Sequence, residues 1–106
     1  MEFFTLSHIE SVGILVVEND VITFINSHLC KIFKTKREQI HGINFEVFCG
    51  NYIKSLGADI NFILKTGKVV ENMYIPNDRQ VRFRAKICPK TDKDFSCIFS
   101  IEGKII

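Results

Sequence analysis

The strongest constraint on the fold is a pair of β-branched apolar segments near the start of the chain, separated by only two residues. Residues 12–18 (VGILVVE) and 21–25 (VITFI) are rich in Val and Ile, as strands are. The connection contains Asn19 and Asp20, which tolerate the left-handed backbone of tight turns. Because strands joined by so short a connection pair antiparallel, the segment predicts a β-hairpin.

Helices are predicted after the hairpin. Asn26 or Ser27 is a suitable cap for a first helix. One face of that helix is formed by Leu29, Cys30, Ile32 and Phe33. Residues 35–38 (TKRE) have the spacing of a capping box, with Thr at the cap. Gly42 suits the left-handed position that ends a helix.

The main helix is predicted between Asn51, as its cap, and Gly67, as its stop. Before it, residues 44–49 predict one helical turn that inserts two Phe side chains into the core. Gly57 interrupts the main helix and indicates a close backbone approach or a bend. The apolar face of this helix is formed by Ile53, Leu56, Ile60, Ile63 and Leu64.

Three strands are predicted at the end of the chain, over residues 68–75, 79–88 and 94–102, with turns between them. One face of the second strand is formed by Val81, Phe83, Ala85 and Ile87. One face of the third strand is formed by Phe95, Cys97, Phe99 and Ile101. An isolated hairpin is marginal in water, so the first hairpin must join these strands in one antiparallel sheet, with the helices on one face. The fold class is therefore α+β.

Composition favours a single globular domain outside a membrane. The chain has 106 residues, of which 46% are hydrophobic, and its formal net charge is +2. No apolar run approaches the roughly 18 residues that span a bilayer, and the N-terminus lacks the basic region of a signal peptide. We therefore expect a cytoplasmic chain without a nucleic-acid or membrane partner. Four cysteines include no C-x-x-C pair, which gives no zinc or redox motif.

Several segments, in this order, resemble the PAS family. Residues 12–18 and 21–26 are similar to its first two strands, and Asn26 stands where the next helix typically starts. Residues 36–42 (KREQIHG) match a basic, acidic, apolar and Gly pattern of the family. Residues 64–70 (LKTGKVV) are similar to the helix-to-strand junction of many bacterial examples. The resemblance covers essentially the whole chain.

This resemblance implies a five-stranded antiparallel sheet in the order 2-1-5-4-3, with helices packed on one face and a small cavity between them. Residues 11–106 would form the PAS domain, and residues 1–10 a helical cap that contributes to pairing. PAS domains sense a ligand, light or redox state, or pair subunits, and regulate a linked effector. That effector is commonly a histidine kinase, a cyclic-dinucleotide enzyme or a transcription regulator, and none is present in this chain. Residues 100–106 (SIEGKII) depart from the Asp-Ile-Thr-like exit that is common in the family.

Two cofactors of the family are disfavoured by the residues present. Flavin photosensors carry a reactive cysteine in a Gly-x-Asn-Cys-x-Phe segment, where this chain has Phe45, and Cys49 comes four residues later. Haem sensors need an axial His on the main helix, which has none. The cofactor is therefore unknown, with the covalent flavin adduct and His-ligated haem disfavoured, while noncovalent flavin and haem held by another residue stay open.

The aromatic residues either fill the core or line a narrow apolar cavity, and the sequence leaves both interpretations open. Phe62 belongs to this aromatic set. A ligand, if bound, should be small and apolar or weakly polar. The candidate pocket residues are Phe33, Phe45, Phe48, Ile60, Leu64, Phe83, Ala85 and Phe99.

Unpartnered apolar residues predict a homodimer through the N-terminal segment and the outer face of the sheet. The candidate interface residues are Phe3, Phe4, Leu6, Ile9, Leu15 and Val17. A basic face is formed by Arg79, Arg82, Arg84 and Lys86. Strand alternation explains it as a solvated surface, without the interleaved aromatic residues that nucleic-acid stacking needs. Arg82 and Arg84 are also candidates for ion pairs across an interface.

Enzymatic activity is not expected. A thiol nucleophile with His28 or His41 as base is the one arrangement on offer, but Cys30 lies two residues from His28 and so points to another side of the helix. A sensory and pairing module is the first hypothesis. A ligand-free dimerisation adaptor is the second, and a thiol enzyme is the least supported.

Overall fold

Strand β1 (Val12–Glu18) and strand β2 (Val21–Ile25) form the hairpin that the sequence predicts, with the predicted bounds. Asn19 and Asp20 make the turn with φ values of 53° and 67°. Both values lie in the left-handed region, which Asn and Asp tolerate better than other side chains.

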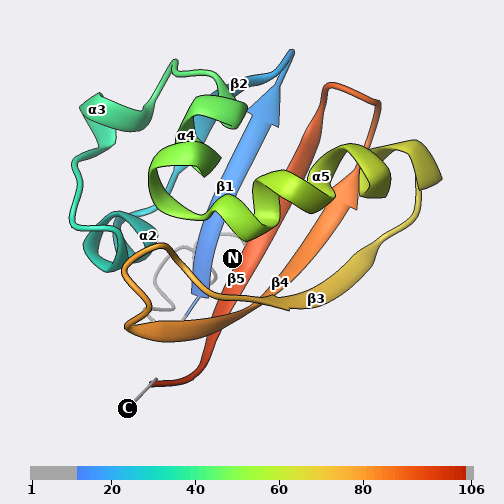
Figure 1. The fold of residues 1–106 in the computed structure, drawn as a ribbon. Helices are drawn as coiled ribbons and strands as arrows, with labels where there is room; N and C mark the ends of the chain where they lie inside the picture. Colours follow the sequence, from blue (N-terminus) through green and yellow to red (C-terminus); the bar gives the residue numbers. More distant parts are fainter. Residues whose placement is uncertain (1–11, 105–106) are drawn as a thin grey trace, which may run out of the picture.

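The computed structural model describes residues 12–104, in which a five-stranded antiparallel sheet carries helices on one face (Figure 1). The remaining strands are β3 (Val70–Tyr74), β4 (Val81–Pro89) and β5 (Phe95–Lys104). The strand order is β2-β1-β5-β4-β3, which confirms the α+β class and the order 2-1-5-4-3. The helical cap predicted for residues 1–10 lies outside the described residues.

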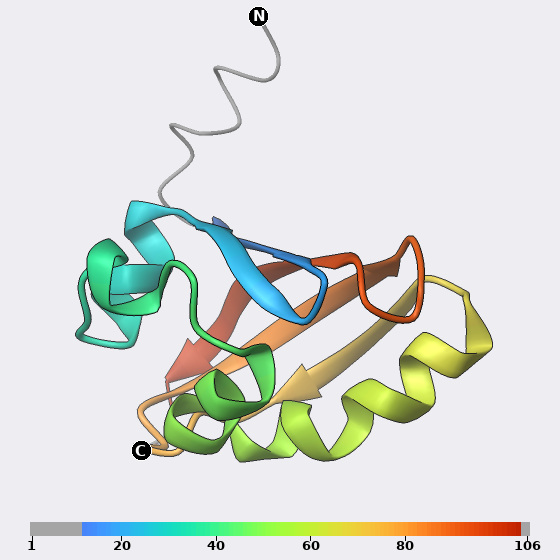
Figure 2. The same cartoon turned by 90° about the horizontal axis from the view of Figure 1, so that it is seen from above.

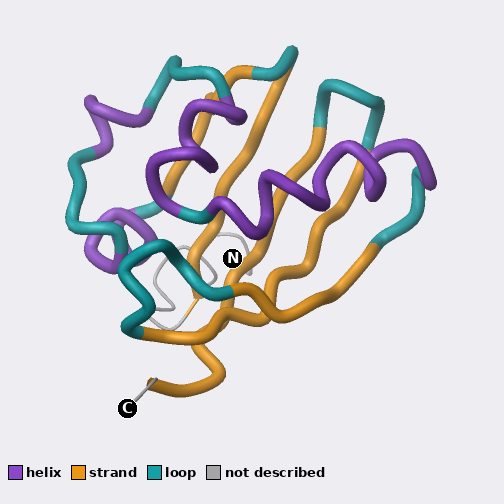
Figure 3. The backbone as a smooth tube through the Cα atoms, viewed as in Figure 1, coloured by secondary structure: helices purple, strands orange, loops and turns teal. Residues whose placement is uncertain are grey.

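The described helices are α2 (Ser27–Ile32), α3 (Arg37–Ile40), α4 (Phe45–Tyr52) and α5 (Lys54–Thr66). Seen from above, they all lie on one side of the sheet (Figure 2). Helix α2 contacts β1, and helix α5 contacts β3 and β4. A single residue separates α4 from α5. The backbone trace shows only a short break between the two helices (Figure 3). No helix within residues 12–104 is long and apolar enough to cross a membrane.

Helix α2 starts with a side-chain cap, and helix α3 starts without one. Asn26 caps α2, since its side-chain oxygen accepts a hydrogen bond from the Leu29 N–H at 3.1 Å. The capping box predicted at Thr35 is wrong, because α3 starts at Arg37 and the extended backbone at Lys36 occupies the cap without a side-chain bond. The Thr35 hydroxyl instead bonds the side chain of Gln39.

The main helix starts later than predicted. Asn51, the predicted cap, lies inside α4, and α5 starts at Lys54. The Lys54 N–H donates to the side-chain oxygen of Asn77, at 3.0 Å, from the connection between β3 and β4. The cap is therefore supplied by a residue remote in sequence. Gly67 ends the helix with a φ of 67°, as predicted.

Gly57 lies at a close contact between α4 and α5. A Cβ atom added at this position would lie 2.9 Å from the Cβ atom of Cys49, which is nearer than carbon atoms pack. The close backbone approach suggested by the sequence is confirmed, and it lets the two helices pack together over the sheet.

The assignment of Leu15 and Val17 to a dimer interface is wrong, because both side chains are fully buried between the sheet and the helices. Both alternating sets of β1 are apolar, so the pattern alone does not show which set faces inward. Gly13 settles the choice, since a Cβ atom there would lie 2.7 Å from Leu29 of α2. The other set, with Ile14 and Val16, faces outward and is half-buried.

Two further apolar residues differ from the sequence interpretation. Phe62 is 74% exposed, because α5 turns Leu56, Ile60 and Ile63 toward the sheet and Phe62 away from it. Ile101 is 42% exposed, although Phe95, Cys97 and Phe99 on the same strand are buried as predicted. The pairing of β4 with β5 shifts between Arg82 and Phe83, next to Ile101, and this irregularity interrupts the alternation.

Candidate functional site

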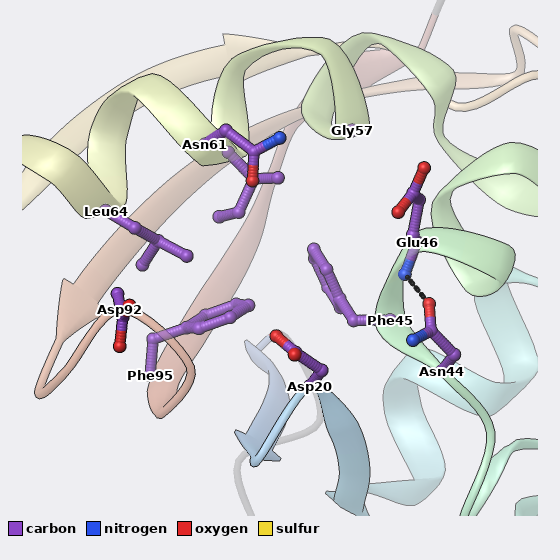
Figure 4. A pocket seen from close by; sticks show the side chains of 10 residues that line it. Asp20, Asn44, Phe45, Glu46, Gly57, Asn61, Leu64, Asp92 and Phe95 are labelled. Carbon is purple, nitrogen blue, oxygen red and sulfur yellow. Dashed lines mark hydrogen bonds between the residues drawn. The ribbon is translucent and has the colours of Figure 1, made fainter.

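A hollow of about 270 Å³ opens at one end of the domain, where four elements meet (Figure 4). Asp20 comes from the β1–β2 turn, Glu46 from the first turn of α4, Leu64 from α5, and Asp92 from the β4–β5 turn. The hollow is therefore built by chain segments that are far apart in sequence.

Apolar side chains form one part of the wall. The rings of Phe45 and Phe95 meet edge to face, with centroids 4.9 Å apart. Both residues are buried, as is Ile60, and Leu64 is half-buried. Gly57 adds a stretch of α5 without a side chain. This part of the hollow suits the apolar portion of a small molecule.

Polar residues form the rest of the wall. Three of them are carboxylates, Asp20, Glu46 and Asp92, and no Lys or Arg lines the hollow. Asn44 caps α4, since its side-chain oxygen accepts hydrogen bonds from the Glu46 N–H at 2.8 Å and the Val47 N–H at 3.3 Å. The hollow thus combines an aromatic wall with a negatively charged mouth.

The backbone of Asp20 joins three of the elements around the hollow. Its N–H donates to the carbonyl oxygen of Lys93 at 3.1 Å, and its carbonyl accepts from the Phe45 N–H at 2.9 Å. Next to it, the Asn19 N–H donates to a carboxylate oxygen of Asp94 at 2.7 Å. The turn of the first hairpin is therefore fixed to the β4–β5 turn and to the start of α4.

Three of the pocket residues expected from the sequence, Phe45, Ile60 and Leu64, line this hollow. The others are buried in the interior between the sheet and the helices, and they are Phe33, Phe48, Phe83, Ala85 and Phe99.

Ring contacts fill that interior. Phe33 lies 5.5 Å from Phe48 and 5.8 Å from Phe83, measured between ring centroids, and Phe83 lies 5.5 Å from Phe99. The aromatic residues were open to two interpretations, a filled core or a cavity lining. These rings fill the core at the centre of the domain, and at its end Phe45 lines an open hollow.

Sequence reasoning missed Phe95 and the three carboxylates as site residues. Each of the four has a local explanation, as a strand residue, a turn residue or a first-turn acid. The pairing of β1 with β5 and the hydrogen bonds between distant turns bring them together, and no short-range pattern encodes those contacts.

The cysteines are free, and three of them are buried. Burial, with a smaller effect from Glu46, raises the pKa of Cys49 to about 12. Burial likewise raises the pKa of Cys97 and the pKa of Cys30. These shifts oppose the thiolate that a nucleophile requires. Cys49 packs against Gly57 and does not line the hollow, which instead has Phe45 at the position of the photosensor cysteine.

The basic side chains of β4 lie on the outer surface of the sheet, where Arg82, Arg84 and Lys86 are exposed. Arg84 forms an ion pair with Glu102 of the neighbouring strand. Arg79 lies outside β4, in a left-handed turn with a φ of 58°, so it does not belong to this face of the strand. In residues 12–104, no group of three or more metal-ligating side chains is placed to hold an ion.

Comparisons with known proteins match the fold but not the sequence. Neither a protein-family profile nor a curated protein matches the chain. A solved PAS domain, crystallised in complex with ethanol, of a LuxR-family transcriptional regulator from Burkholderia thailandensis has 16% identity and a TM-score of 0.63. The match covers 96% of this chain and 98% of that one.

Two further solved structures are similar to the same extent. The PAS domain of nitrogen regulation protein NR(II) from Vibrio parahaemolyticus has 12% identity and a TM-score of 0.63, with 97% of each chain covered. A PAS domain from a two-component sensor histidine kinase has 15% identity and a TM-score of 0.61, with 97% of this chain and 93% of that chain covered. Similarity at these identities is informative about the fold.

Proposed function

We propose that this chain, which has the PAS fold, is a cytoplasmic sensory signalling domain that binds a small ligand, pairs subunits and regulates a linked effector. The effector would be a histidine kinase, a cyclic-dinucleotide enzyme or a transcription regulator. The hollow at the end of the domain carries the proposal, because it occurs in a fold shared with PAS domains of a sensor kinase and a transcriptional regulator. Four free cysteines fit a reducing compartment.

The bonds around Asp20 support a route by which a bound ligand would affect the sheet. A molecule in the hollow touches Phe45 and Phe95, and it lies beside the turn that joins α4 to the β4–β5 connection. Strand β5 starts at Phe95 and runs through the centre of the sheet to the end of the described residues. A ligand that changes the spacing of these turns therefore acts directly on β5.

Pairing is proposed through the outer face of the sheet, where Ile14 and Val16 now take the place of Leu15 and Val17. Ile14 pairs with Ile98 of β5 in the strand register, and Phe24 of β2 is 41% exposed beside Val16. Apolar side chains on adjacent strands form a surface suited to a second copy. The N-terminal candidates Phe3, Phe4, Leu6 and Ile9 lie outside the described residues and remain candidates.

Analytical ultracentrifugation of the full chain tests the pairing. We expect a dimer that Ile98→Arg converts to monomer, since the substitution places a charge in an apolar contact. Phe62→Arg is the matched control, because Phe62 is exposed on α5, on the side of the domain opposite the outer sheet face. A wild-type chain that stays monomeric at high micromolar concentration would contradict the pairing.

A ligand-free dimerisation adaptor is the second candidate, and the filled centre of the domain favours it. Native mass spectrometry and an absorption spectrum of the protein as purified separate the two. A bound mass or a visible band supports sensing. A clean apo mass, together with a failure of small molecules to bind the hollow, supports the adaptor.

A further inference from the structure

We propose that the hollow selects a small organic cation, a protonated amine carried on a short apolar body. The inference rests on the proposed ligand-binding function and adds the chemical class of the ligand, a cation where the sequence alone predicts an apolar or weakly polar molecule. It is based on the charges around the mouth of the hollow and on the aromatic wall inside it.

The charge around the hollow is opposite in sign to that of the whole chain. The chain has a formal net charge of +2, yet the hollow is lined by three carboxylates and no basic side chain. None of the three forms an ion pair or a side-chain hydrogen bond with another residue in the described range 12–104. A local negative potential in a concave surface raises the concentration of cations there and disfavours anions.

Local structure explains an acid at each position taken singly. Asp20 stands in a hairpin turn, Glu46 stands in the first turn of a helix, and Asp92 stands in the β4–β5 turn. Those local roles do not require the three side chains to lie near one another. The side chains nevertheless border the same hollow, although they come from three separate elements. Their convergence, next to a pair of aromatic rings, is the feature that points to a cationic ligand.

The spacing of the carboxylates favours an organic cation over a metal ion. They stand around the hollow, with Glu46 and Asp92 on opposite sides of the Phe45 and Phe95 rings (Figure 4). No group of three such residues within residues 12–104 is close enough to share an ion. An alkylammonium head beside a carboxylate, with its carbon body against the two rings, satisfies both kinds of wall.

Three probes that share one carbon skeleton test the charge preference. Phenethylamine is a cation at neutral pH, 2-phenylethanol is neutral, and phenylacetate is an anion. Titration of the 15N-labelled full chain should shift the amide signals of Gly57, Ile60 and Phe95. We expect the amine to bind about tenfold tighter than the alcohol, and the acid to bind weakest. Raising the salt concentration should weaken binding of the amine but not of the alcohol.

Charge-neutralising variants identify the groups responsible. Glu46→Gln, Asp92→Asn and Asp20→Asn keep the side-chain shape, and Asn at position 20 tolerates the left-handed turn. Each should lower the affinity for phenethylamine several-fold and leave that for 2-phenylethanol unchanged. Glu38→Gln is the matched control, because Glu38 is exposed on α3, which contributes nothing to the hollow.

The three probes separate the failure of this inference from the failure of ligand binding. If the alcohol binds as tightly as the amine, or the acid binds more tightly, the charge preference is wrong while ligand binding stands. If the amine shifts signals away from the hollow, the site is wrong. If no probe shifts the hollow amides, the inference is overturned and the ligand-binding half of the proposed function loses its support. Pairing, measured separately by ultracentrifugation, is unaffected by any of these results.

Discussion

Asn26 and Ile14 are joined by two hydrogen bonds that run in opposite directions. The Asn26 N–H donates to the Ile14 carbonyl at 3.0 Å, and the Ile14 N–H donates to the Asn26 side-chain oxygen at 3.1 Å. The side-chain NH2 of Asn26 also donates to the Val12 carbonyl at 2.8 Å. Asn26 is only 6% exposed, so one buried amide ties the start of β1 to the start of α2.

Asn26→Ala should destabilise the domain strongly. The substitution leaves the Ile14 and Leu29 N–H groups and the Val12 carbonyl without this partner, and each buried unpaired group costs about 1–3 kcal/mol. We expect a loss of roughly 3 kcal/mol in the free energy of unfolding, measured by urea denaturation. Asn61→Ala, on the exposed surface of α5, is the control and should change stability by less than about 0.5 kcal/mol.

Two Gly→Ala substitutions in neighbouring helices should have opposite effects. Gly57→Ala places a Cβ atom 2.9 Å from that of Cys49, and the resulting strain of about 1–3 kcal/mol exceeds the roughly 1 kcal/mol gain in helix propensity. Gly50→Ala meets no atom within 4 Å, so only the gain remains. Thermal unfolding should therefore give a lower midpoint for the first variant and a higher one for the second. Equal unfolding midpoints for the two variants would contradict a tight contact and would mean that α4 and α5 can move apart at Gly57.

The buried thiols should resist alkylation in the folded protein. The pKa of Cys49 is raised to about 12, so its thiolate fraction at pH 8 is of order 10⁻⁴. Cys97 has a raised pKa for the same reason, while Cys88 is partly exposed. Mass spectrometry after a short iodoacetamide pulse should find Cys88 labelled first, with Cys49 and Cys97 labelled only after denaturation. Fast native labelling of Cys49 would show that α4 opens readily.

Tyr74→Phe should remove a link between β3 and α5. The Tyr74 hydroxyl donates to a carboxylate oxygen of Asp59 at 2.9 Å, and its loss should cost about 1 kcal/mol at neutral pH.

Ionisation of Tyr74 should lower the free energy of unfolding at alkaline pH. Burial raises the pKa of Tyr74 from 10.0 to about 12, with hydrogen bonding to Asp59 acting in the same direction. The folded state therefore keeps a proton that the unfolded state loses, and the stabilisation present below pH 10 is lost as the pH rises to about 12. The stability difference between wild type and Tyr74→Phe, measured by urea denaturation, should shrink over this interval. A difference independent of pH would contradict the raised pKa.

Local sequence patterns predict the elements of this domain better than their junctions. The hairpin has its predicted bounds because the two strands and the Asn19–Asp20 turn are specified by neighbouring residues. Sequence patterns misplace the start of α5, because the side chain that caps it, Asn77, comes from a connection more than twenty residues away. Sequence patterns misassign the inward face of β1, because both faces are apolar and the close approach of Gly13 to Leu29 becomes visible only in the folded structure.

The sequence predicts only those site residues that belong to a local pattern. Phe45, Ile60 and Leu64 are apolar residues on helical faces, which periodicity identifies. Asp20 and Asp92 belong to turns whose meeting depends on hydrogen bonds such as that from the Asp20 N–H to Lys93. The carboxylates therefore become visible as a group only in three dimensions.

The central position of β1 and β5 has a mechanical consequence. The two strands are antiparallel neighbours, and Val12 at the start of β1 pairs with Ser100 toward the end of β5. Tension applied to those two points would open the ladder from one end, breaking its hydrogen bonds one after another instead of all at once. The domain should therefore yield at low force when stretched between β1 and β5, and an atomic-force measurement in that direction should record unzipping.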